Sequence, residues 1–97
     1  MLTVDFERFP IIPGERVLDL GAGAGRHSFA LLRRGADVVA LDYSMSEMES
    51  VAGMFAAMRE AGEVPEGASS LAVRGDAYRL PFPDASFDKV EIGRAHV

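Results

Sequence analysis

Short apolar runs alternate along the chain with segments whose apolar residues recur at helical spacing. The runs, which are typical of buried strands, lie at residues 16–20, 37–41, 70–74 and 87–90. The helical patterns lie at residues 26–34 and 44–61. This alternation predicts an α/β fold with a Rossmann-like parallel sheet, and right-handed crossovers would give its four strands the order 3-2-1-4.

The ends of both helical segments carry recognisable signals. Gly35 and Gly62 follow the two helices, where a residue that tolerates positive φ is favoured. Two overlapping capping boxes, residues 44–47 and 46–49, begin the second helix. A stripe of Met and other apolar residues on this helix is interpreted as core packing, because Met fills irregular gaps. Its members are Met45, Met48, Val51, Ala52, Phe55 and Met58.

Composition limits the classes of protein that fit. The chain has 97 residues, of which 48% are hydrophobic, so it forms one modest domain. It has no Cys, which excludes disulfides and thiolate metal sites, and we expect no metal ligand. Its net charge is −5 and it has no basic run, which argues against nucleic-acid binding. No apolar stretch approaches the ~18 residues of a membrane span, and the acidic N-terminus is unlike a signal peptide. We therefore expect a cytoplasmic protein.

A glycine-rich loop, residues 21–25, follows the first strand and precedes the first helix. This order is typical of nucleotide sites, because glycine permits close approach to the backbone and a helix N-terminus offers N–H groups. The loop lacks the spacing of the dinucleotide fingerprint, since Arg26 stands where the third glycine is needed. No Gly-Lys-Ser/Thr follows either, so a P-loop is excluded.

Three carboxylates lie at or near the ends of the first three strands. They belong to Asp19, Asp42 and Asp76. The C-terminal ends of parallel strands open onto one crevice, so we expect these acids to converge there. They would repel a phosphate and favour a ligand with positive charge and hydroxyl or amino donors. S-adenosylmethionine has that profile.

Three segments resemble the class I S-adenosylmethionine-dependent methyltransferases, in particular those related to the ubiquinone and menaquinone biosynthesis enzymes. Residues 17–25 resemble the family's first motif, although Ala22 stands where Cys is common. Residues 39–44 resemble the second-strand motif, and residues 75–88 resemble the third, which is the most specific. The resemblance extends from residue 15 to residue 90.

The resemblance implies how the cofactor would be bound. The glycine loop would hold the methionyl part, with Asp19 near its ammonium group. Asp42 would accept hydrogen bonds from both ribose hydroxyls, and Asp76 from the adenine amino group. The Ala77 N–H would meet the adenine ring, between apolar walls. The implied cofactor-binding residues are Asp19, Gly21, Ala22, Gly23, Gly25, Asp42, Tyr43, Met45, Asp76 and Ala77.

Each polar residue also has a purely structural interpretation. Asp42 could only cap the second helix, and Asp76 could only stabilise a turn. Asp19 could hydrogen-bond the loop backbone. His27 is expected to be an ordinary, partly exposed histidine, and Arg26 either reaches the cofactor carboxylate or lies in solvent.

The family continues past the fourth strand with elements that complete a seven-stranded sheet and form most of the acceptor pocket. We therefore expect residues 1–90 to be an incomplete cofactor-binding domain, inactive alone and with no catalytic residue. Residues 91–97 are expected to be a non-native tail, because one choice of codons for them reproduces the start of a common sequencing adapter. Sequencing the gene from an adapter-free library tests this hypothesis.

The sequence thus predicts the cofactor-binding half of a methyltransferase that acts on an unidentified, small-molecule acceptor. Two alternatives stay open. An NAD-dependent oxidoreductase shares the strand, glycine loop and distal acid, but needs the longer glycine spacing. A non-catalytic module could keep the cofactor fold for binding or assembly.

Overall fold

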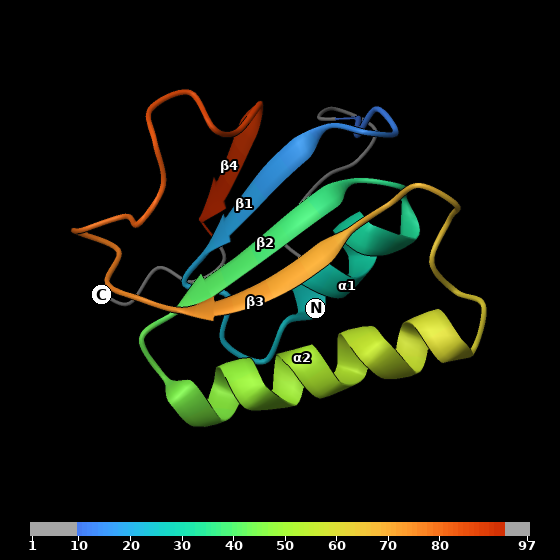
Figure 1. Cartoon of the computed structure of the whole chain (residues 1–97), viewed down its shortest axis with the longest axis horizontal. Helices are drawn as coiled ribbons and strands as arrows, with labels where there is room; N and C mark the ends of the chain where they lie inside the picture. The colour runs from blue at the N-terminus through green and yellow to red at the C-terminus, as the bar shows by residue number, and fades with distance from the viewer. Residues whose placement is uncertain (1–9, 93–97) are drawn as a thin grey trace.

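The computed structural model of the chain describes residues 10–92, which form one four-stranded sheet and two helices (Figure 1). The strands are β1 (Arg16–Leu20), β2 (Asp37–Asp42), β3 (Ser70–Arg74) and β4 (Lys89–Ile92). Their order across the sheet is β3-β2-β1-β4, and every neighbouring pair is parallel. The predicted α/β class and the predicted strand order are both confirmed.

The helices are α1 (Arg26–Arg33) and α2 (Met45–Glu60). The first of the two capping boxes begins α2, because the Ser44 hydroxyl accepts a hydrogen bond from the Glu47 N–H over 3.2 Å. Helix α1 ends one residue earlier than predicted, and Arg34 is its C-cap. Within the described residues, neither helix is long and apolar enough to cross a membrane.

Both helices pack on the same face of the sheet and share one core with it. The rings of Phe29 in α1 and Phe55 in α2 meet edge to face, with centroids 5.7 Å apart. The α2 residues predicted as core are mostly buried, although Met45 and Ala52 are exposed. The buried core residues are Val17, Leu31, Leu32, Ala36, Val38, Ala40, Met48, Val51, Phe55, Met58 and Ala68.

The opposite face of the sheet is buried only at its centre. Side chains alternate between faces along a strand, so the residues next to Val17 and Val38 point away from the helices. At the centre of that face Leu18 is buried. Toward its edges Leu71, Val90 and Ile92 are 55%, 56% and 65% exposed. A sheet face with this many apolar side chains in water is costly for a small domain.

The last strand lies two residues further along the chain than predicted. Pairing with β1 begins at Lys89, opposite Val17, and the preceding Phe87 packs its ring against Phe82 at a centroid distance of 5.1 Å. The strand includes Glu91 and Ile92, which belong to the proposed tail. Ladder hydrogen bonds are made by the backbone whatever the side chain. The adapter hypothesis therefore stays a prediction, and residues 93–97 and the N-terminal residues 1–9 lie outside the described part.

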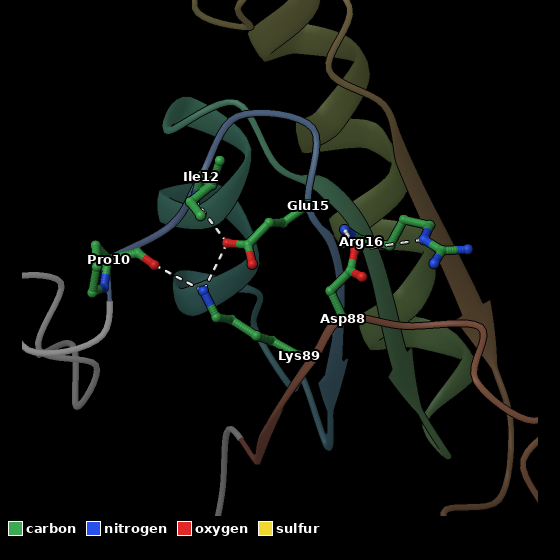
Figure 2. A network of polar contacts seen from close by, with 6 residues as sticks. All are labelled: Pro10, Ile12, Glu15, Arg16, Asp88 and Lys89. Atoms are coloured by element: carbon green, nitrogen blue, oxygen red, sulfur yellow. Dashed lines mark hydrogen bonds and ion pairs between the residues drawn. The ribbon is translucent and has the colours of Figure 1, made fainter.

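A polar network joins β4 to the beginning of β1 (Figure 2). The glycine loop follows the other end of β1, so the network lies at the opposite end of that strand. The Lys89 Nζ donates to Glu15 Oε1 over 2.7 Å, and the same oxygen accepts the Ile12 N–H over 2.7 Å. Beside it, the Arg16 N–H donates to Asp88 Oδ2 over 2.9 Å. These bonds lower the pKa of both the Glu15 and the Asp88 carboxyl groups. The network therefore holds the start of β4 against the start of β1 and lies away from the candidate site.

Candidate cofactor site

The glycine loop folds over the carboxyl end of β2. The N–H groups of Gly21 and Ala22 both donate to the Leu41 carbonyl, over 2.9 and 3.0 Å. The Gly25 N–H donates to the Ala22 carbonyl over 3.0 Å, which closes the loop just before α1. The loop thus lies between the end of one strand and the beginning of a helix, as the sequence predicts for a nucleotide-type site.

Gly25 is a loop position where a larger residue would be strained and would displace its neighbours. Its φ is +88°, in the left-handed region that favours glycine. A Cβ at this position would lie 2.7 Å from the Phe29 ring and 2.9 Å from Val51 Cγ2. The glycine therefore lets the loop lie directly on the contact between α1 and α2.

Asp42 links the glycine loop to the start of α2. Its Oδ2 accepts the Gly23 N–H over 2.8 Å and its Oδ1 accepts the Ser44 N–H over 2.9 Å. The N-cap of α2 is Ser44, so Asp42 does not cap the helix itself but binds the backbone of the residue that does. A carboxylate offers about four acceptor positions. With two of them used by the backbone, Asp42 retains acceptor capacity for ligand hydroxyls.

Asp19 is fully buried between β1 and α1. Its Oδ2 accepts a hydrogen bond from the Ser28 hydroxyl over 2.6 Å. Its Oδ1 has no hydrogen-bond partner among the residues that the structure describes. Burial raises the pKa of the Asp19 carboxyl, and the bond from Ser28 and the nearby His27 oppose that rise. A buried carboxylate with one oxygen unpaired is costly unless a ligand completes it.

Asp76 lies in an exposed turn after β3. Its Oδ1 accepts the Tyr78 N–H over 2.8 Å, and its carbonyl accepts the Arg79 N–H over 3.0 Å. This is the turn role that the structural interpretation described. The preceding Gly75 N–H donates to the Asp42 carbonyl over 2.9 Å, so the turn starts beside the end of β2. The adenine role of Asp76 and of the exposed Ala77 stays a prediction.

Tyr43 and Met45, predicted as apolar walls, are both exposed beyond the end of β2. The Arg74 guanidinium lies 4.7 Å from the centroid of the Tyr43 ring, and its Nε donates to the Tyr43 carbonyl over 3.2 Å. No role was predicted for Arg74 from the sequence. Its position as the last residue of β3 was the only available signal, since its partner is 31 residues away.

The three acids lie at or near the ends of β1, β2 and β3, and their convergence on one crevice stays a prediction. Asp42 and the Asp76 turn share the end of β2, whereas Asp19 is hydrogen-bonded to α1. His27 differs from expectation, because it is only 7% exposed, in the first turn of α1, where it contributes to the electrostatics of Asp19. Arg26 is exposed, as one of its two interpretations allowed.

Comparison with known proteins identifies the family. Residues 17–97 match the family of methyltransferase domains, and the chain belongs to it. It is 43% identical over 79 residues to the demethylmenaquinone methyltransferase of Thermobifida fusca, covering 81% of this chain and 30% of that protein. It is 48% identical over 84 residues to the enzyme of the same name from Beutenbergia cavernae, covering 82% and 28%. The resemblance to class I methyltransferases of the menaquinone-related type is confirmed.

A solved structure supports the fold independently. The chain is similar to an S-adenosylmethionine-dependent methyltransferase from Methanosarcina mazei, with a TM-score of 0.73 and 22% identity, over 93% of this chain and 42% of that one. The chain spans about 30% of the length of the curated relatives it matches.

Proposed function

We propose that this chain is the cofactor-binding part of a longer S-adenosylmethionine-dependent methyltransferase, which acts on a small-molecule acceptor in the cytoplasm. The family match and the two demethylmenaquinone methyltransferase relatives support this proposal. The relatives make a quinone-like aromatic acceptor the first class to test. The net charge of −5 argues against a nucleic-acid acceptor.

One observation carries the proposal beyond family membership: Oδ1 of the buried Asp19 has no hydrogen-bond partner within residues 10–92. A phosphate ligand would be repelled by this buried carboxylate, whereas an α-ammonium group would supply both charge and hydrogen-bond donors. The Asp42 carboxylate has acceptor capacity for a ribose diol at the neighbouring strand end. These hydrogen-bond acceptors therefore fit S-adenosylmethionine better than a dinucleotide.

The cofactor supplies an electrophilic methyl group on its sulfonium sulfur. The residues of this chain would bind and orient it: Asp19 at the ammonium group, the loop of residues 21–25 along the methionyl part, and Asp42 at the ribose. Asp76 and Ala77 would meet the adenine, with Tyr43 and Met45 as walls. Holding two reactants in line accounts for much of the acceleration of such a transfer. We assign no catalytic residue within the chain.

The cofactor assignment is tested by isothermal titration of the full-length protein that contains this chain. We expect S-adenosylmethionine and S-adenosylhomocysteine to bind and NAD not to bind. Measurable NAD affinity, together with no heat from either adenosyl ligand, would overturn the proposal in favour of an oxidoreductase. Binding of S-adenosylmethionine without methyl transfer to any tested quinol, phenol or amine would instead favour the non-catalytic module.

A further inference from the structure

The buried pair of Ser28 and Asp19 carries an inference that rests on the proposed function. Ser28 lies in the first turn of α1, and Asp19 is the fourth residue of β1. Both side chains are fully buried, and 2.6 Å separates Ser28 Oγ from Asp19 Oδ2. This distance is typical of a hydroxyl that donates to an ionised carboxylate, which is among the stronger hydrogen bonds in proteins.

The bond leaves the carboxylate with two unequal oxygens. A serine hydroxyl can donate one hydrogen bond, and Ser28 donates it to Oδ2 of Asp19. Because α1 and β1 are each held in the core, the hydroxyl limits rotation of the carboxylate about its own axis. Oδ1 is left without a partner within the described residues.

A purely structural tie between α1 and β1 would not need this arrangement. A neutral side chain with a single carbonyl oxygen, such as that of Asn, could accept the hydrogen bond from Ser28 at a lower desolvation cost. Asp19 instead keeps an ionisable group out of water while its Oδ1 has no hydrogen-bond partner within the described residues. Such an orphaned oxygen calls for an explanation outside the protein's own contacts.

We propose that Ser28 is a positioning residue, which holds Asp19 so that Oδ1 receives the α-ammonium group of the cofactor. The ammonium group would complete the hydrogen bonding of the carboxylate and neutralise its buried charge. Ser28 itself would not touch the cofactor. Its contribution should therefore depend on two partners, the ammonium group of the ligand and the carboxylate of Asp19.

The first dependence is tested with two ligands in the full-length protein that contains this chain. S-adenosylhomocysteine carries the α-ammonium group, whereas methylthioadenosine keeps the adenosine and lacks the amino-acid part. Ser28→Ala should raise the Kd for S-adenosylhomocysteine roughly tenfold, since a hydrogen bond to a charged group is lost. The Kd for methylthioadenosine should not change.

Three further single variants separate positioning from packing. Ser28→Thr keeps the hydroxyl and should bind S-adenosylhomocysteine like the wild type. Ser28→Cys keeps the size but donates weakly, and should weaken binding as Ser28→Ala does. It also keeps the test valid if Ser28→Ala fails to fold. Ser50→Ala, at an exposed position of α2, is the matched control and should change nothing.

The second dependence is tested with a double-mutant cycle. In an Asp19→Asn background, adding Ser28→Ala should cause no further loss of S-adenosylhomocysteine affinity. The inference is overturned if the two losses add, if Ser28→Ala weakens both ligands equally, or if it weakens neither. If the wild-type protein binds neither ligand, the proposed function itself is overturned. Failure of the proposed function is thereby distinguished from failure of the Ser28 inference alone.

Discussion

Gly23 and Asp42 are joined across 19 residues by a 2.8 Å hydrogen bond from the Gly23 N–H to Asp42 Oδ2. The acid that ends β2 therefore holds the loop that follows β1. Its other oxygen accepts the Ser44 N–H at the start of α2, so one carboxylate connects three consecutive parts of the site. Its structural and ligand-binding roles are compatible, because the backbone bonds leave acceptor positions unused.

Asp42→Ala should weaken S-adenosylmethionine binding to the full-length protein by about 1.5–3 kcal/mol, the loss expected for hydrogen bonds to a charged acceptor. Isothermal titration measures the change. Asp84→Ala, which removes an exposed carboxylate from the loop before β4, is the matched control and should leave the Kd unaltered. If Asp42→Ala binds S-adenosylmethionine with the same Kd as the wild type, Asp42 has no ligand-binding role and only makes its backbone contacts.

Asp76→Ala should weaken binding less than Asp42→Ala does, because Asp76 is exposed and the Ala77 backbone contact with adenine survives. Asp76→Asn separates the two roles of this residue. Its amide oxygen can still accept the Tyr78 N–H and preserve the turn, but less acceptor capacity remains for an adenine amino group. Titration should show weaker binding for both variants. If Asp76→Asn binds like the wild type while Asp76→Ala does not, the turn alone matters.

The fold was predictable because its determinants are local. Each strand is a short apolar run, a glycine follows each helix, and the handedness of crossovers sets the strand order. The exception was β4, whose beginning depends on its register against β1. Register is a property of paired strands, so an apolar run gives only its approximate position.

The site residues that belong to a sequence motif were predictable. The residues whose roles depend on contacts between different helices and strands were not. The glycine loop and Asp42 follow from spacing along the chain. Ser28 was missed because its partner lies in β1, across the glycine loop, and a serine in a helix has no distinctive sequence signal. The burial of His27 was missed for a similar reason, since the first turn of α1 faces the core only once the loop has folded back.

Gly25→Ala and Gly53→Ala should have opposite effects on stability. At Gly25 the new Cβ would meet Phe29 and Val51 at a positive φ, which should cost about 1–3 kcal/mol, as overpacking does. Gly53 lies exposed in α2 with nothing within 4 Å of the new Cβ, so alanine should stabilise the helix by about 0.5–1 kcal/mol. Urea denaturation of the full-length protein measures both. Equal effects would contradict the close packing at Gly25.

Asp19→Asn should make the protein more stable at neutral pH while weakening cofactor binding. Burial raises the pKa of Asp19 above its ordinary value of 3.8, so the unfolded chain ionises first as the pH increases. The wild type therefore loses stability from about that pH upward, until the folded carboxyl has also ionised. Denaturation at several pH values should show the advantage of Asp19→Asn shrinking as the pH falls toward 3.8. An advantage that is independent of pH would contradict the role of ionisation.

The chain on its own should be marginally stable and should self-associate. Complete domains are stable by only ~5–15 kcal/mol, and here Leu71, Val90 and Ile92 lie exposed on the sheet face opposite the helices. Each large apolar side chain left in water forgoes about 1.5–3 kcal/mol of burial, and β3 and β4 are both sheet edges. Residues 1–92 should elute as aggregates in size-exclusion chromatography and melt without cooperativity. Leu71→Lys should reduce association, because a charge on an edge strand opposes pairing. A monomer with a cooperative melt that S-adenosylhomocysteine shifts upward would show that the four strands and two helices suffice for folding and for binding.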